Sequence, residues 1–417
     1  MSPSPAVTPP PGQPRFAGLD ALRAFAVIAV VICHASGVAG VWRTTSWGWI
    51  GEAAQAGVVV FFVLSGFLVY RPFVAAHAAG ERGPTVGRYA RRRLLRIVPA
   101  YWVALTVLSL FPGTAGTFSD DWWKYYFLLN GYETSAVGGG IGIAWSLGAE
   151  VAFYLLLPFL AVLATRCARR WAPDRWWRGE LVVVVAFGLF SPVVLLGVNA
   201  AIVGSTGDPL IPISLYPTIL GVTDWFAAGM LLAVVSVAAA ERPGRARRLT
   251  ERVARHGPLL WALAVLAWLF GARAPWLFGA HLSMPLVVHL SYTVASLLVV
   301  APVVCGAGGI VGRVTRWRGL ALLGLISYGV YLWHYVIAWW LGGGGDPAFA
   351  AGPGLADRPH ALVTVTVATF ALSIAIAALS YRVVELPFLR RKEGPRHDPA
   401  ASVSAGDGSG PTPTRSA

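Results

Sequence analysis

The chain has 417 residues, of which 56% are hydrophobic and only 12% are charged. A soluble protein would carry about twice that share of charged residues, so the composition excludes an ordinary soluble domain and predicts a polytopic membrane protein. The formal net charge of +14 does not call for nucleic acid as a partner, because the basic residues gather in particular connections between apolar segments.

Ten apolar segments are expected to cross the bilayer, since each approaches the length that a membrane-spanning helix needs. They are predicted at residues 20–40, 55–75, 97–112, 143–165, 180–199, 218–238, 258–272, 284–306, 320–341 and 361–384. The Trp-rich stretch 122–129 is too short to cross and is placed at the membrane interface or in a re-entrant loop. The predicted fold class is therefore all-α, a polytopic transmembrane helix bundle.

The two ends of the chain differ from this bundle in composition. Residues 1–14 are rich in proline and lack an apolar region, so no cleavable signal peptide is predicted and the first span is expected to be retained. Residues 393–417 are polar and rich in Gly, Ser and Pro. Both ends are expected to be disordered arms around a membrane-embedded domain of residues 15–392.

Basic residues are concentrated in alternate connections of the predicted bundle. The connections after the second, fourth, sixth and eighth segments, with the C-terminal end, hold most of them, including Arg88, Arg91, Arg92, Arg93, Arg96, Arg166, Arg169, Arg170, Arg245, Arg247, Arg248, Arg313, Arg316, Arg318, Arg390 and Arg391. The opposite connections hold only Arg43, Lys124, Arg273 and Arg358. By the positive-inside rule, both termini are predicted to be cytoplasmic in the plasma membrane.

The first segment carries Arg23 near one end and His34 eleven residues later. Eleven residues of α-helix make about three turns, so both side chains share one face, about 16 Å apart along the axis. Ionisable residues inside a membrane are costly and usually face a bundle interior or a watery cavity. One interpretation is that Arg23 snorkels to the interface and His34 is a packing residue. For the pair, we favour a helix that lines a reaction path.

The predicted topology sorts the buried ionisable residues into two layers separated by an apolar stretch. The outer layer consists of His34, Glu150, Asp224, His289 and His334. The inner layer consists of Asp20, Arg23, Arg93, Arg96, Arg382 and Glu385. A histidine beside a carboxylate is a candidate general base, and arginines suit a phosphorylated ligand because guanidinium binds phosphate in bidentate fashion.

Each of these assignments has a structural alternative. Glu150 is predicted to orient His34, with Asp224 as the rival partner. The structural alternative for Glu150 is a role in capping the helix. It fits poorly, because the run from Ser146 to Glu150 is one residue too long for a capping box. The basic cluster at 91–96 also satisfies the positive-inside rule, and single buried histidines such as His289 and His334 are more often packing residues than catalytic ones. Cys33, Cys167 and Cys305 show neither metal-site nor disulfide spacing, so no metal is expected.

Six stretches together resemble the integral-membrane acyltransferase 3 family. They are LDALRAFAVIAVVICHA (19–35), FFVLSGFLVYRPF (61–73), RRRLLRIVPAYW (91–102), AWSLGAEVAFYLLLP (144–158), ISYGVYLWHYV (326–336) and VELPFLR (384–390). They occur in the order typical of that family, whose members O-acylate sugars, cell-surface polymers and some secondary metabolites.

The resemblance implies an O-acyltransferase that moves an acyl group, with acetyl expected, from acyl-CoA to a hydroxyl of a carbohydrate or glycosylated acceptor. His34 would be the general base or would form an acyl-histidine intermediate, with Arg23, Glu150 and Asp224 also in the catalytic group. Arg93, Arg96 and Arg92 are assigned to the acyl-CoA site, and Trp145, Tyr154 and His334 to the acceptor substrate. The alternative function is a proton-coupled transporter or exporter, because ten spans with buried acids and histidines also suit that task.

Overall fold

The computed structural model describes residues 18–133, 136, 138–206, 217–241, 244–278, 284–343 and 352–390. The two predicted disordered arms lie outside these residues. Within the described ranges the elements are helices, without a strand. The α-helices are α1 (Leu19–Val38), α2 (Val41–Thr44), α3 (Trp49–Ala53), α4 (Ala56–Ala78), α5 (Val86–Leu108), α6 (Trp122–Tyr126), α7 (Trp145–Ala168), α8 (Trp177–Thr206), α9 (Thr223–Glu241), α10 (Arg245–Arg255), α11 (Gly257–Phe278), α12 (Met284–Val304), α13 (Gly309–Thr315), α14 (Arg318–Leu325), α15 (Ser327–Gly342), α16 (Ala361–Ser380) and α17 (Leu386–Arg390).

The structure confirms an all-α membrane bundle. Nine described helical segments are long and apolar enough to span a bilayer, and the bent pair α14 and α15 makes a tenth if it is counted as one span. The axes of that pair differ by 69°, whereas the sequence predicted one continuous helix at 320–341. The chain bends at Ile326, just after Gly324, where the backbone of Asp20 on α1 comes so close that no side chain would fit.

Helix α5 starts earlier than the sequence predicted, at Val86 instead of residue 97. Its first turns carry the arginines of the 88–96 stretch, and apolar residues between them such as Tyr89 lie on a buried face. The segment predicted from hydropathy began only after the arginines. An amphipathic helix can continue through them, because their side chains reach away from its apolar face. As a result Arg93 and Arg96, three residues apart, lie on one side of a formed helix.

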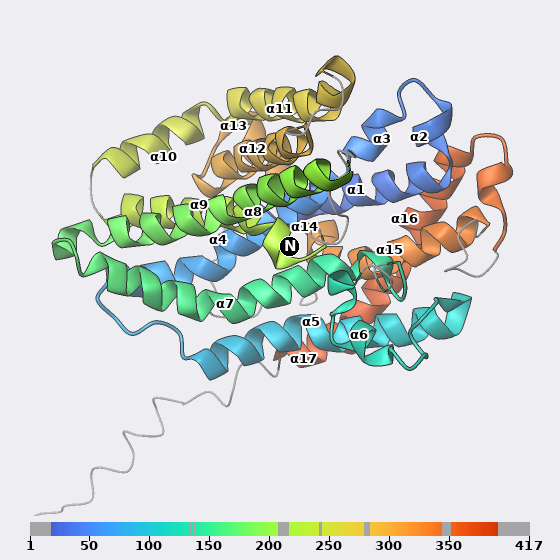
Figure 1. The fold of residues 1–417 in the computed structure, drawn as a ribbon, viewed down its shortest axis with the longest axis horizontal. Coiled ribbons are helices and arrows are strands. Elements are labelled where there is room, and N and C mark those ends of the chain that lie inside the picture. The colour runs from blue at the N-terminus through green and yellow to red at the C-terminus, as the bar shows by residue number, and fades with distance from the viewer. Residues whose placement is uncertain are drawn as a thin grey trace, which may run out of the picture.

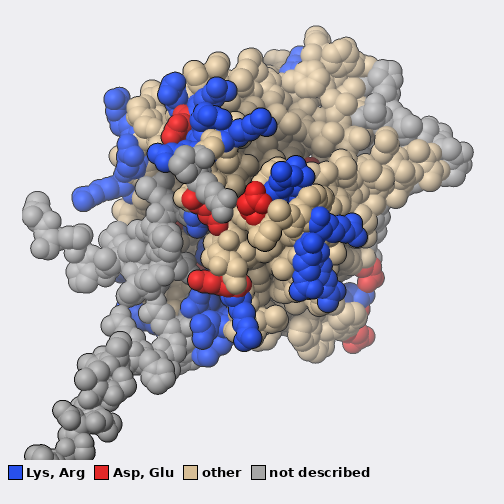
Figure 2. Space-filling model, turned by 90° about the vertical axis from the view of Figure 1, so that its left-hand side faces the viewer, with Lys and Arg blue, Asp and Glu red and all other residues tan. Residues whose placement is uncertain are grey.

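The long helices run roughly along one direction, and α1 lies among α4, α14, α15 and α16 (Figure 1). The connections α4–α5, α7–α8 and α9–α10 lie at the left end in Figure 1, and α2, α3 and α6 lie toward the right. We call the left end the Arg-rich end. It carries the exposed side chains of Arg88, Arg92, Arg169, Arg170, Arg245, Arg247 and Arg248. Figure 2 shows Lys and Arg side chains gathered on this face.

Two glycines bring the backbones of α4 and α9 into direct contact. A Cβ atom on Gly66 would lie 2.1 Å from the carbonyl oxygen of Phe226, and one on Gly229 would lie 2.0 Å from that of Val63. Small residues let the backbones of membrane helices approach closely, which gives the dispersion contacts that hold such helices together. This crossing fixes α4, which forms one wall of the pocket described below.

We expect Gly229→Ala to lower the apparent melting temperature of the purified protein in detergent. The added methyl would collide with backbone atoms of Val63 and Phe67 on α4, and overpacking of this kind costs about 1–3 kcal/mol. The matched control is Gly197→Ala on α8, where a Cβ atom meets nothing within 4 Å and alanine favours the helix. The same melting temperature for wild type and Gly229→Ala would contradict the proposed tight crossing.

Candidate functional site

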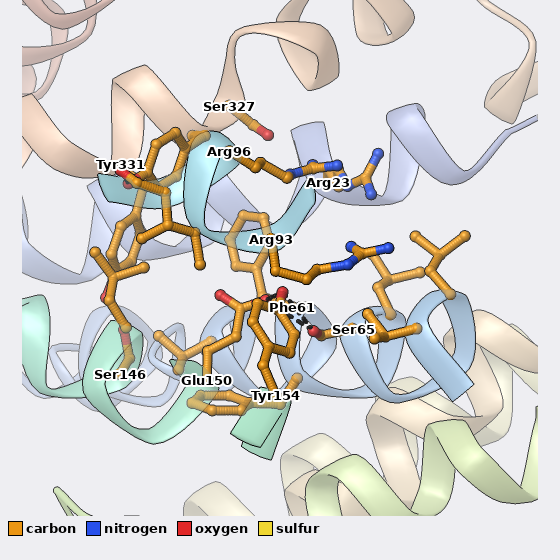
Figure 3. Close-up of a pocket in the computed structure, with 18 residues that line it drawn as sticks. Arg23, Phe61, Ser65, Arg93, Arg96, Ser146, Glu150, Tyr154, Ser327 and Tyr331 are labelled. Atoms are coloured by element: carbon orange, nitrogen blue, oxygen red, sulfur yellow. Dashed lines mark hydrogen bonds between the residues drawn. The ribbon is translucent and has the colours of Figure 1, made fainter. Parts of the chain in front are cut away.

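A pocket opens between α1, α4, α5, α7 and α15, and encloses about 820 Å³ including its mouth. Its lining combines three arginines, one carboxylate, several hydroxyls and an apolar wall from α4 (Figure 3). The lining residues are Arg23, Val58, Phe61, Phe62, Leu64, Ser65, Leu68, Val69, Arg93, Arg96, Ile97, Ser146, Leu147, Glu150, Tyr154, Ser327, Tyr328 and Tyr331.

Three guanidinium groups from two helices meet in this pocket, as the sequence predicted. Arg23 comes from α1 and pairs with Asp20 at 2.8 Å. Arg96 of α5 lies near enough for its positive charge to repel that of Arg23. Arg93 lies with its guanidinium carbon 5.6 Å from the ring centroid of Tyr154. The Nε atom of Arg93 is buried without a hydrogen-bond partner in the described part of the chain. Like charges repel strongly in a medium of low polarity, so an anion is the ligand that this group favours.

Glu150 lies in the same pocket at the centre of a hydrogen-bonded group. Its Oε1 atom accepts from the Ser65 hydroxyl at 2.7 Å and from the Tyr154 hydroxyl, and these two hydroxyls are 3.2 Å apart. Figure 3 shows Glu150, Tyr154 and Ser65 close below Arg93. The predicted apolar separation between Glu150 and the arginine layer is therefore wrong. The same pocket holds the carboxylate of α7 and the arginines of α1 and α5.

The error has a physical cause in the start of α7. The predicted depth of Glu150 assumed that the bundle begins at the end of the apolar segment, but residues 141–144 and 146–149 are buried. The chain around Leu128 lies across the first turn, and a Cβ atom on Gly148 would be 2.5 Å from the Leu128 carbonyl oxygen. Trp145, also in this turn, stacks on Phe62 with ring centroids 6.3 Å apart. The segment that includes α6 therefore covers the start of α7, and Glu150 lies deeper than the count implied.

His34 does not line the pocket and has a histidine as its partner. Its Nδ1 atom lies 3.0 Å from Nε2 of His334 on α15, and its ring meets Tyr335 edge-on at 4.9 Å. Glu150 and Asp224 bond to other groups, so the prediction that a carboxylate orients His34 is wrong among the residues described here. His334 is fully buried, which places it beside His34 instead of on an open substrate surface.

Tyr331 stands between the pocket and the histidine pair. Its hydroxyl donates to the carbonyl of Ile143 at 3.0 Å and lies 2.7 Å from the Ser146 hydroxyl. Its ring lines the pocket, and its centroid is 5.7 Å from that of His334. The arginines, Glu150 and the histidines thus follow one another along the inner surface of the bundle.

Asp224 belongs to a separate polar cluster that joins α8, α9 and α12. It accepts hydrogen bonds from Ser191 at 2.7 Å, from His289 at 2.8 Å and from Thr293 at 2.8 Å. The His289 ring stacks on Trp225 with centroids 4.9 Å apart. Because these partners satisfy the buried carboxylate and none of them lines the pocket, the geometry favours a role in holding the three helices together.

The structure also places residues that the sequence analysis missed. Ser65 was not singled out, although a lone serine within the apolar stretch 61–73 is a polar signal. A second buried carboxylate, Glu180 on α8, accepts from the Tyr70 hydroxyl and lies 2.6 Å from Nδ1 of His77. Arg92, which the sequence assigned to the acyl-CoA site, is exposed and is not among the lining residues. Within the described ranges no group of His, Cys, Asp and Glu could hold a metal ion.

Comparison with known proteins agrees with the resemblance seen in the motifs. The acyltransferase domain of the acyltransferase 3 family matches residues 16–378. YrhL of Bacillus subtilis, a protein named for peptidoglycan O-acetylation, is 25% identical over 340 residues, which is 77% of this chain and 48% of YrhL. Nodulation protein 10 of Rhizobium leguminosarum bv. viciae is 24% identical over 412 residues, 89% of this chain and 92% of that protein.

The O-acetyltransferase OatA of Staphylococcus aureus is 24% identical over 400 residues, 92% of this chain and 58% of OatA. The chain thus spans about half the length of YrhL and OatA and nearly all of Nodulation protein 10. No solved structure matches the chain significantly. The family match decides against the transporter that the sequence left as an alternative, because it covers most of the helical bundle. With its spans, its motifs and this match over residues 16–378, the chain belongs to the acyltransferase 3 family and is a membrane-embedded acyltransferase.

Proposed function

We propose that this acyltransferase moves an acyl group, acetyl in the simplest case, from acyl-CoA to a hydroxyl of a carbohydrate or glycosylated acceptor. The observation that carries the proposal is the pocket in which Arg23, Arg93 and Arg96 meet. From Arg23, helix α1 runs about 16 Å to His34. A phosphorylated group at the arginines and a reacting thioester near His34 match the two ends of this path.

The charge of the pocket supports a phosphorylated donor. Its lining has three arginines and one carboxylate, Glu150, and this leaves an excess of positive charge. Arg93 has a buried Nε atom that lacks a partner in the described chain, and a phosphate oxygen is a suitable acceptor for it. The phosphates of CoA would lie at the arginines, and the pantetheine arm would extend along the apolar wall of α4 past Phe61 toward Tyr331.

The transfer step would use His34 as the general base. The acceptor hydroxyl gives its proton to the His34 ring while its oxygen attacks the thioester carbonyl carbon. The carbon–sulfur bond then breaks, the acyl group stays on the acceptor oxygen, and the CoA thiolate takes the proton back from His34. An acyl-histidine intermediate is the alternative route, in which His34 attacks the carbonyl first and the acceptor hydroxyl displaces it.

The relatives support a carbohydrate as the acceptor class. Two of them, YrhL and OatA, are named for O-acetylation, and YrhL for peptidoglycan as the acceptor. We also propose that the Arg-rich end faces the cytoplasm of the cell, with both termini on that side of the plasma membrane, because basic connections are retained there. The arginines of the pocket then meet cytoplasmic acyl-CoA.

We expect His34→Ala to abolish acyl transfer. Loss of a general base lowers turnover by about 10²–10⁴-fold, and loss of a covalent nucleophile would lower it at least as much. The measurement is transfer of labelled acetyl from acetyl-CoA to peptidoglycan fragments and simple glycosides by purified protein in nanodiscs. An unchanged melting temperature and unchanged acetyl-CoA binding serve as controls, and substantial transfer by the variant would refute the role of His34.

Lysine substitutions separate a phosphate site from simple charge topology. Arg93→Lys and Arg96→Lys keep the charge but lose the planar fork, so each should weaken acetyl-CoA binding by about tenfold or somewhat more. Calorimetry at two salt concentrations measures this change. Arg88→Lys, at an exposed position on the same helix, is the matched control and should bind like wild type. Wild-type affinity in both pocket variants would leave only the positive-inside explanation.

The two carboxylates should respond differently to neutralisation. Glu150→Gln should lower kcat by about tenfold or more, because it disturbs the hydrogen-bonded group of Glu150 with Ser65 and Tyr154 in the pocket. It should not weaken acetyl-CoA binding, because it removes a negative charge from the pocket lining. Asp224→Asn should lower the melting temperature more than kcat, since Asp224 joins three helices outside the pocket. Kinetics and thermal melting of both variants test this contrast. An inactive, stable Asp224→Asn beside a fully active Glu150→Gln would reverse the assignment.

A further inference from the structure

The contacts of His34 and His334 determine which ring nitrogen of each histidine carries a hydrogen. His34 lies on α1 and His334 on α15, and these helices pack against each other. The two rings are tilted by 42°, with centroids 5.1 Å apart, and Nδ1 of His34 faces Nε2 of His334 at 3.0 Å. A neutral imidazole has one donor nitrogen and one acceptor nitrogen, and the other bonds of the ring decide which is which.

The backbone of α15 determines the proton position on His334. Its Nδ1 atom lies 2.8 Å from the carbonyl oxygen of Tyr331 and 3.1 Å from that of Val330. A carbonyl oxygen only accepts, so Nδ1 of His334 carries the hydrogen. Its Nε2 atom then has the lone pair and accepts from His34.

The same logic continues to His34. Because Nε2 of His334 is an acceptor, Nδ1 of His34 carries the hydrogen, and Nε2 of His34 has the free lone pair. The opposite arrangement would place two N–H groups or two lone pairs against each other, or would require a positive charge on the fully buried His334 ring, which is costly among membrane helices. The direction of the chain is therefore from His34 through His334 to the Tyr331 carbonyl.

We propose that His334 is a positioning residue that fixes the tautomer of His34 and leaves its Nε2 atom as the base. This rests on the proposed function of His34. When Nε2 of His34 takes the proton from the hydroxyl of the acceptor substrate, the hydrogen bond from Nδ1–H of His34 to His334 becomes charge-assisted and stronger. The pair therefore also stabilises the imidazolium form of His34. A backbone carbonyl and a second histidine supply the orientation that a carboxylate supplies in a Ser-His-Asp triad. Its complete burial gives His334 no open contact with substrate.

Two amide variants of His334 separate this role from packing. In His334→Gln the side-chain oxygen reaches the place of Nε2 and still accepts from His34. In His334→Asn the shorter amide reaches only the place of Nδ1 and keeps the bond to the Tyr331 carbonyl. His34 then loses the His334 acceptor and keeps only its backbone hydrogen bond with Val30. We expect kcat within about tenfold of wild type for the glutamine variant and a loss of about 10²–10⁴-fold for the asparagine variant. KM should change little in either.

The proton position itself is read by ¹⁵N NMR of histidine-labelled full-length protein in nanodiscs, with the His34 signals identified by their loss in His34→Ala. The expected result for wild type and His334→Gln is a protonated Nδ1 and a bare Nε2 on His34, and a mixed or reversed pattern in His334→Asn. This reading of the wild type tests the proposal even if the asparagine variant fails to fold.

A bare Nδ1 on wild-type His34, or wild-type kcat in a folded His334→Asn variant, would overturn the proposal. Loss of activity in both amide variants with an unchanged His34 tautomer would also overturn it, because His334 would then act by packing or substrate contact. Activity in His34→Ala with the expected tautomer in wild type has a different meaning: the proposed function of His34 would fail, while the assigned proton position would stand.

Discussion

Guanidinium groups among membrane helices are costly unless water, an acid or an anion compensates their charge. In this bundle Arg23, Arg93 and Arg96 are accommodated in three ways: Asp20 pairs with Arg23, the Tyr154 ring faces Arg93, and the pocket leaves room for a ligand. The positions of α1, α5 and α7 follow from this requirement, since each supplies an arginine or a compensating group. The pocket that leaves room for a ligand is thus also the place where Arg23 and Arg93 lie partly buried, whereas Arg96 is exposed.

Three carboxylates inside the bundle, Glu150, Asp224 and Glu180, are satisfied in a different manner, mostly by hydroxyls and histidines. Glu150 accepts from Ser65 and Tyr154, and Asp224 accepts from Ser191, His289 and Thr293. Glu180 is held by Tyr70 and His77. Each carboxylate bonds to residues of at least one other helix, so it acts as a polar cross-link in a bundle whose apolar faces could slide. His34 bonds to none of these carboxylates, and its side-chain partner is His334.

Much of the fold could be predicted from the sequence, because the spans are long apolar runs and the motifs keep their order. The prediction missed the early start of α5, where arginines interrupt the hydropathy but not the amphipathic helix. It also missed the break between α14 and α15, which depends on the contact of Gly324 with the backbone of Asp20, about 300 residues away. The arginine group was predicted because its members occupy the same side of the membrane. The partners of Glu150 and His34 could not be predicted, because the depth of a residue along a helix does not say which neighbouring helix its side chain meets. His34 and His334 are also 300 residues apart in the sequence.

The glycine crossing of α4 and α9 has a consequence for how the pocket can change its width. Helix α4 supplies most of the apolar lining, including Phe61 and Phe62, and its other side rests directly on backbone atoms of α9. A helix supported in this way has no space into which to retreat. Any widening of the pocket must therefore come from smaller side chains at positions such as Phe61 and not from movement of α4, so the width of the pocket depends on individual side chains on a rigid wall.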